Sequence, residues 1–85
     1  MVLLSNDQVS VDTGLYIACM ITSHAPRDLW NVELLAWKEA GLLFPSVVRC
    51  PKVFGLDHIL ILRCLGPLPT SDWTRVQSRF RAALA

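Results

Sequence analysis

The stretch Leu15–Thr22 constrains the fold of this chain more than any other part of its sequence. It reads Leu-Tyr-Ile-Ala-Cys-Met-Ile-Thr, an almost continuous apolar run that is rich in strand-forming residues. β-Branched and aromatic side chains favour extended backbone, and an apolar run without alternation is typical of a strand covered on both faces. We therefore expect a central strand over this stretch, buried on both faces.

The segments around this run are expected to form further short strands. A turn at residues 5–7 and a polar stretch up to Gly14, in which Val9 and Val11 alternate, precede the central strand. Pro51 interrupts a later strand, and because proline cannot donate to a ladder, that strand must lie at a sheet edge or contain a bulge there. The further strands that we expect are at 2–4, at 30–37 (half exposed), at 46–56 and at 59–65.

The C-terminal tail is predicted to be an amphipathic helix. Thr70 or Ser71 can cap its first turn, and Asp72 places a negative charge at the positive end of the helix dipole. Its apolar residues recur at spacings of three and four and so share one face: Trp73, Val76, Phe80 and Leu84. The predicted fold class is therefore mainly β, with about five short strands and one C-terminal helix packed against them.

Length and charge limit the function classes that this chain can belong to. Its 85 residues are fewer than the roughly 100–200 of a typical domain, so we expect a single domain over residues 1–85. Hydrophobic residues make up 53% of the chain and charged residues 18%, which excludes intrinsic disorder. A net charge of +1 excludes a strong overall field for nucleic acid or membrane. So short and apolar a chain is expected to bury part of its surface in an oligomer.

The cysteines and the N-terminus indicate a cytosolic protein. The three cysteines form no CxxC pattern, and Cys19 and Cys64 lie in apolar runs, where we expect buried reduced thiols. Reduced cysteines are typical of the cytosol. The first residues lack the basic start of a signal peptide, and no apolar run approaches the roughly 18 residues needed to span a bilayer.

The end of the predicted central strand carries the best candidate site, Thr22-Ser23-His24. Two hydroxyls and an imidazole could bind a phosphate and move a proton near neutral pH. Arg27 and Arg49 could add planar, permanently charged phosphate partners, which together would make a metal-free phosphodiesterase site. The alternative is that the hydroxyls satisfy turn backbone, that the histidine is solvated, and that Arg49 lies on an exposed face.

Other candidate sites are weaker. His24 and His58 are far apart in the sequence and have no acidic cluster beside them, so no metal site and no cofactor are predicted. Trp30 and Trp37 point to opposite faces of the strand expected at 30–37, so one of them must leave the core side. An exposed tryptophan, for which Trp30 is our candidate, could stack on a base or fill a partner interface. The basic residues of the tail could touch nucleic acid or be solvated: Arg75, Arg79 and Arg81.

The order of these segments resembles the MazF/PemK family of toxins from bacterial toxin–antitoxin modules. The resemblance covers about residues 2–84, and its most specific parts are Ile21-Thr22-Ser23 followed by Ser46-Val47-Val48-Arg49-Cys50. It implies a small SH3-like barrel with a C-terminal helix, shared with the CcdB gyrase poisons. It also implies a cytoplasmic bacterial homodimer that cleaves single-stranded mRNA sequence-specifically and without metal, by attack of the ribose 2′-hydroxyl on the adjacent phosphate.

The resemblance also assigns roles to individual residues. Thr22 would hold the scissile phosphate, Ser23 would assist RNA binding, and Arg49 would act as a general acid or stabilise developing charge. Apart from the resemblance, the residues themselves lead us to place Arg27 in the same local groove as an RNA-binding residue, and His24 is our hypothesis for the base. The implied protein partner is an antitoxin that lays a flexible acidic tail over the RNA groove and the dimer surface.

The chain departs from the family pattern in two ways. Family members begin earlier, with a strand, a loop over the active site and an arginine, so we expect an N-terminally short domain with an unpaired edge and a non-standard dimer. Pro51 stands where PemK-type members carry an acidic residue. The alternative function is therefore a weakly active or inactive relative that binds antitoxin or a full-length toxin. A gyrase poison ranks last, because the chain ends in Arg-Ala-Ala-Leu-Ala and not in the Trp-Gly-Ile type of ending.

Overall fold

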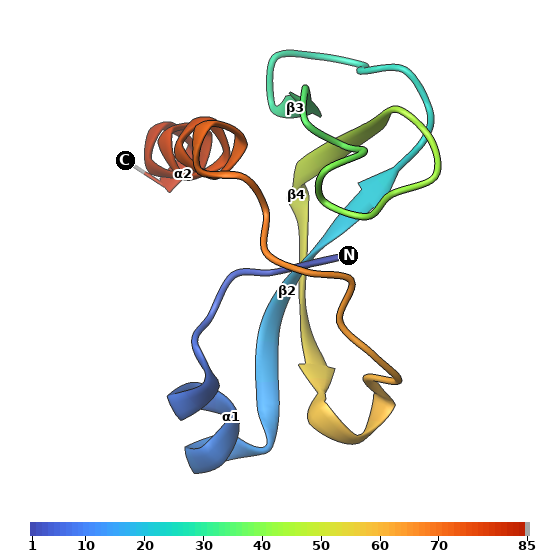
Figure 1. Cartoon of the computed structure of the whole chain (residues 1–85). Coiled ribbons are helices and arrows are strands. Elements are labelled where there is room, and N and C mark those ends of the chain that lie inside the picture. The colour runs from blue at the N-terminus through green and yellow to red at the C-terminus, as the bar shows by residue number, and fades with distance from the viewer. Residues whose placement is uncertain (85) are drawn as a thin grey trace.

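The computed structural model describes residues 1–84, which form one curled antiparallel sheet with a helix across its face (Figure 1). Its elements in chain order are β1 (Val2–Leu3), α1 (Asp7–Thr13), β2 (Leu15–Thr22), β3 (Asn31–Leu34), β4 (Ser46–Asp57), a 3-10 turn (His58–Leu60) and α2 (Thr70–Leu84). The spatial order of the strands is β1-β2-β4-β3. The predicted fold class, mainly β with a C-terminal helix, is confirmed.

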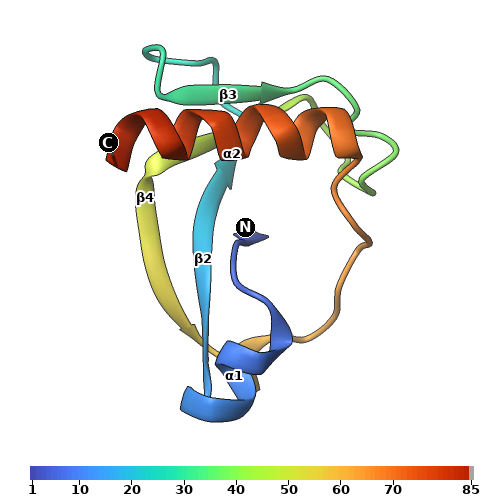
Figure 2. The same cartoon turned by 90° about the vertical axis from the view of Figure 1, so that its left-hand side faces the viewer.

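The two helices lie at opposite ends of the long strands. α2 runs along β3, whereas α1 lies at the far end of β2 (Figure 2). The core lies between α2 and the sheet, and its residues are Cys19, Val32, Leu34, Val48, Cys50 and Val76. None of the helices within residues 1–84 is long and apolar enough to cross a membrane.

The central strand has the predicted bounds, but its burial differs from the prediction. Only Ala18 and Cys19 are buried, while Leu15, Ile17 and Met20 are exposed. The strand is long, and α2 covers only one part of the sheet. The expectation of burial on both faces over the whole strand is therefore wrong.

Pro51 lies in a bulge, which is one of the two alternatives that the sequence left open. Cys19 pairs with Val53 but Met20 pairs with Arg49, so the β4 residues Cys50, Pro51 and Lys52 fall between consecutive rungs of the ladder. Before the bulge β4 is a central strand, paired with β2 and β3. The bulge bends β4 and brings its first half under α2.

The segment expected to be turn and polar loop before the central strand contains helix α1. Asn6 caps it, because its side chain accepts a hydrogen bond from the Val9 backbone N–H at 3.3 Å. Gly14 ends the helix in a left-handed conformation with φ of 78°. These two caps outweigh the two-residue alternation of Val9 and Val11 that indicated extended chain.

Two other predicted strands are shorter or absent. The strand expected at 30–37 spans only Asn31–Leu34, since the backbone N–H groups of Leu35 and Ala36 donate to the Asp72 carboxylate and not to a strand. The segment 59–65 begins as a 3-10 turn and then runs without ladder pairing, and Leu62 is 97% exposed.

The helix stripe and the cysteines were predicted in part. Val76 is fully buried, and Trp73, Phe80 and Trp37 pack against the core, but Leu84 is exposed. The three thiols are free. Cys19 and Cys50 are buried, whereas Cys64, which was expected to be buried, is exposed on the unpaired segment after the 3-10 turn.

Candidate nucleic-acid site

The ladder between β2, β4 and β3 places Thr22 and Arg49 on one face of the sheet. Thr22 pairs with Val47, and Arg49 pairs with Met20 on one side and Asn31 on the other. Thr22 and Arg49 are thus diagonal neighbours, with Cα atoms roughly 7–8 Å apart. Ile21 and Val48, which pair with each other between these two rungs, point the other way into the core. The face that carries Thr22 and Arg49 is therefore the outer face, on the side of the sheet away from α2.

Thr22 and His24 form a local pair at the end of β2. The Thr22 Oγ1 lies 2.9 Å from His24 Nδ1 and accepts a hydrogen bond from the His24 backbone N–H at 3.2 Å. In one neutral tautomer, Nδ1–H donates to the hydroxyl oxygen and leaves the lone pair of Nε2 free. Thr22 then still has its own O–H to donate to another group.

The loop between β2 and β3 is held by Asp28 and Asn31. Asp28 Oδ1 accepts from the Trp30 backbone N–H at 2.9 Å and from Asn31 Nδ2 at 3.2 Å. Asn31 Oδ1 accepts from the Arg27 backbone N–H at 3.3 Å. Because Asn31 is also the β3 partner of Arg49, this network fixes the backbone of the exposed Arg27 relative to Arg49.

The backbone of Arg49 is held from the core side. Cys19 Sγ donates to the Arg49 carbonyl at 3.0 Å. Burial raises the pKa of Cys19 to about 11 and also raises the pKa of Cys50, so both thiols stay protonated near neutral pH.

Two guanidinium groups are available for an anion. Within residues 1–84, neither Arg27 nor Arg49 forms an ion pair. The ion pairs in this part of the chain join His58 to Asp57 and Arg75 to Asp72. Arg27 is exposed and Arg49 is half-buried. No group of three or more His, Cys, Asp or Glu side chains in this part of the chain could hold a metal ion. The arrangement therefore offers charge, a hydroxyl and an imidazole to a phosphate.

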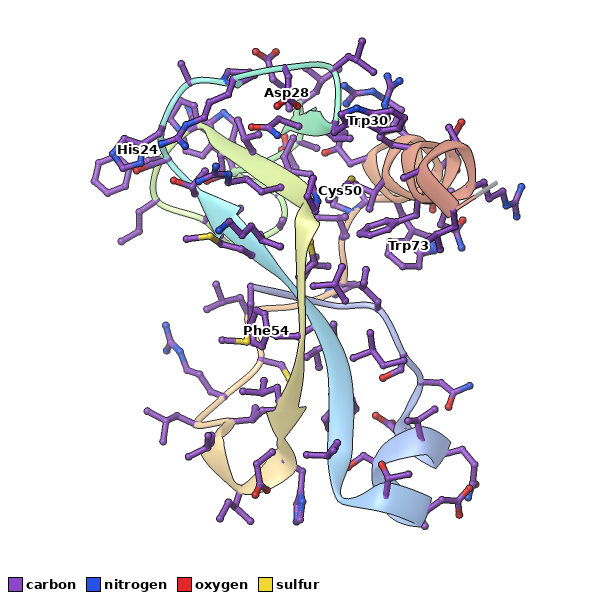
Figure 3. The ribbon with its side chains drawn as sticks, turned by 180° about the vertical axis from the view of Figure 1, so that it is seen from behind. His24, Asp28, Trp30, Cys50, Phe54 and Trp73 are labelled. Carbon is purple, nitrogen blue, oxygen red and sulfur yellow. The ribbon has the colours of Figure 1, made fainter. Side chains whose placement is uncertain are left out.

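The structure brings some of the predicted site residues together and separates one from them. Thr22, His24 and Arg49 share the outer face and its edge, and the exposed Ser23 and Arg27 follow on the adjoining loop. Trp30 is half-buried and lies on the side of α2, away from His24 (Figure 3). Its carbonyl accepts from the Cys50 N–H at 3.2 Å, which joins the loop to β4.

Sequence reasoning missed two polar residues on this face. Asn31 and Glu33 lie on the β3 side of Arg49 and Val47, respectively. Their alternation with the buried Val32 and Leu34 was visible in the sequence. Only the pairing of β3 with β4 shows that they stand beside the arginine.

The fold is a curled antiparallel sheet with a C-terminal helix, and its outer face carries a hydroxyl, an imidazole and an arginine that forms no ion pair within residues 1–84. Residues 1–84 match the model of the family described as "PemK-like, MazF-like toxin of type II toxin-antitoxin system". The chain belongs to this family, which confirms the resemblance inferred from its segments.

Solved structures support the same assignment. The chain is similar to MazE–MazF from Deinococcus radiodurans in crystal form II, with 26% identity and a TM-score of 0.80 over 99% of this chain and 78% of that one. Form III of the same complex gives 26% identity and a TM-score of 0.80, over 98% of this chain and 81% of that one. No curated protein matches the sequence.

Proposed function

We propose that this MazF-like toxin is an endoribonuclease that cleaves single-stranded RNA by attack of a ribose 2′-hydroxyl on the adjacent phosphate. The observation that carries the proposal is the hydrogen-bonded pair of Thr22 and His24, with Arg49 as its diagonal neighbour on the same face. Such a site supplies a base, a hydroxyl donor and a fixed positive charge, which are what this reaction requires.

The proposed reaction assigns one task to each side chain. His24 Nε2 takes the proton of the 2′-hydroxyl, and the 2′-oxygen forms a bond to phosphorus. The bond from phosphorus to the 5′-oxygen breaks, and the products are a cyclic phosphate and a 5′-hydroxyl. Thr22 donates its O–H to a non-bridging phosphate oxygen. Arg49 stabilises the charge that develops on the phosphate; because arginine keeps its proton, the leaving oxygen takes a proton from water.

The test is cleavage of a mixed-sequence single-stranded RNA in EDTA. We expect Thr22→Val and Arg49→Gln each to lower the rate by about 10²- to 10³-fold, and His24→Asn by about 10²- to 10⁴-fold. Arg63→Gln, which removes an exposed arginine of the segment between the 3-10 turn and α2, is the matched control for Arg49→Gln and should cleave like the wild type. Equal cleavage by wild type and all three site variants, with unchanged circular dichroism, would contradict the proposed site.

The partners that we propose are an antitoxin and a second copy of the chain. Both similar structures are complexes named MazE–MazF, which supports an antitoxin as a partner. We propose that the antitoxin lays a flexible acidic tail over the face that carries Arg27 and Arg49. Exposed apolar residues such as Ile17, Val53 and Leu62 support a homodimer. We further propose that the protein acts in the bacterial cytoplasm.

Two measurements test these partners. Light scattering after gel filtration should give twice the monomer mass, and a monomer at high concentration would refute the homodimer. Addition of the antitoxin should stop RNA cleavage. If the antitoxin binds but the chain cleaves no RNA, the chain is the inactive binding relative and not an enzyme.

A further inference from the structure

Phe44 is a large aromatic side chain that projects from the loop before β4. It is 65% exposed. An aromatic side chain in this position gains little from the core of its own chain, and its flat apolar face is free to contact another molecule. The neighbouring Leu43 is also exposed, which provides a matched residue for comparison.

The backbone around Phe44 is held in place. Ser46 Oγ donates to the Phe44 carbonyl at 2.8 Å. Pro45 follows directly and disfavours the helical conformation for Phe44, which lies in a bend. The side chain is therefore presented from a fixed loop, at little cost in conformational entropy when it binds.

The ladder places this loop at the candidate nucleic-acid site. Val47 of β4 pairs with Thr22, the last residue of β2. Phe44 lies three residues before Val47, and His24 lies two residues after Thr22. Both residues are therefore close to the same end of the sheet. Figure 3 shows the segment that enters β4 on the same side of the molecule as His24, whereas Trp30 lies towards α2. The loop that carries Phe44 thus adjoins the end of the sheet at which Thr22 and His24 lie.

We propose that Phe44 is a base-stacking residue, which holds one base of the RNA while Thr22 and Arg49 hold the neighbouring phosphate. The inference rests on the proposed function. Fixed cationic groups combined with an exposed aromatic ring are the usual means of binding single-stranded nucleic acid, because every base has a π-face. The unpaired charges of Arg27 and Arg49 favour an anionic polymer over an apolar peptide as the occupant.

The test measures binding separately from cleavage. The ligand is the RNA that the wild type cleaves, carrying a single 2′-deoxy substitution at the cleaved position and a fluorescent label, and binding is followed by anisotropy. Phe44→Ala should raise Kd by about 5- to 150-fold, the range expected for the loss of one stacked base. Phe44→Trp should retain the wild-type affinity, and Leu43→Ala should stay within about twofold of it.

A second set of ligands distinguishes stacking from a merely structural effect. Abasic sites are introduced one at a time along the same RNA. At one position the abasic RNA should bind wild type and Phe44→Ala with equal affinity, because the base that Phe44 contacts is missing. If no position abolishes the difference between the two proteins, the stacking role is refuted.

The remaining outcomes separate this inference from the proposed function. If the wild type cleaves RNA and Phe44→Ala binds it equally well, only the stacking role falls. If Phe44→Ala keeps its RNA affinity but loses antitoxin binding, the stacking role is likewise refuted and Phe44 belongs to a protein interface. If the wild type neither cleaves nor binds RNA, both proposals are refuted.

Discussion

Asp72 offers the sharpest test of how α2 is attached to the sheet. Its carboxylate is fully buried and accepts hydrogen bonds from the backbone N–H groups of Leu35 at 3.1 Å and Ala36 at 2.8 Å. Arg75 Nη1 also donates to it at 3.2 Å and donates to the Glu33 carbonyl. One side chain thus ends β3 and anchors the first turn of α2.

Replacing Asp72 by alanine removes this acceptor and leaves two backbone donors without a partner. Hydrogen bonds to a charged group contribute about 1.5–3 kcal/mol each, so we expect the loss of two to lower the free energy of unfolding by about 3–6 kcal/mol. The whole free energy of unfolding of a chain of this length is about 4–13 kcal/mol. The melting temperature should therefore fall by at least about 12 °C.

The assay is thermal and urea unfolding followed by far-UV circular dichroism. Arg75→Ala removes only the exposed partner of the carboxylate and should cost at most about 1 kcal/mol. Asp72→Asn keeps one acceptor oxygen, so its free energy of unfolding should lie between those of Asp72→Ala and Arg75→Ala. Asp12→Ala, an exposed acidic residue of α1, should change stability by less than about 0.5 kcal/mol. If Asp72→Ala melts within about 4 °C of the wild type, the anchoring role is refuted.

Four further predictions concern the thiols, the core and one glycine. Folding raises the pKa of Cys19 from 9.0 to about 11. The free energy of unfolding should therefore be retained below pH 9 and fall by about 2–3 kcal/mol as the pH rises from 9 to 11. In alkaline melts Cys19→Ala should lose less stability over this range than the wild type. In a native thiol assay Cys64 should react at once, and all three thiols should react only after unfolding. Val76→Ala should cost about 2–3 kcal/mol in urea unfolding, because Val76 is fully buried. Gly14→Ala should cost about 1–2 kcal/mol, since its φ of 78° is unfavourable for alanine.

Local pattern predicted the elements whose signals lie within one segment. The bounds of β2 follow from its apolar run, and α2 follows from the spacing of Trp73, Val76 and Phe80. α1 was missed because Val9 and Val11 alternate, although the caps Asn6 and Gly14 were present in the sequence. In so short a helix the caps carry more information than the periodicity.

Contacts between distant segments decided the rest. β3 ends at Leu34 because Asp72 takes the next two backbone N–H groups, and nothing in the sequence near β3 indicates this. The candidate site likewise has one part that follows from local sequence and one part that depends on distant contacts. The Thr22–His24 pair is local and was predictable, whereas the position of Arg49 depends on the pairing of Thr22 with Val47, which only the register of the sheet determines.

The partial pairing of β4 has a consequence for local opening of the molecule. β3 covers only Ser46–Arg49, and the ladder of β1 ends at Ala18. At the far end Leu15 and Tyr16 have only Asp57 and Leu56 as ladder partners, whereas the backbone of Ile17 is still bonded to Leu4 and Ser5. A two-stranded ribbon is marginal by itself, so its amide hydrogens should exchange with solvent long before those of Val48 and Val32. The end that carries α1 can then open and close as a separate unit, while the three-stranded end keeps Thr22 and Arg49 in register.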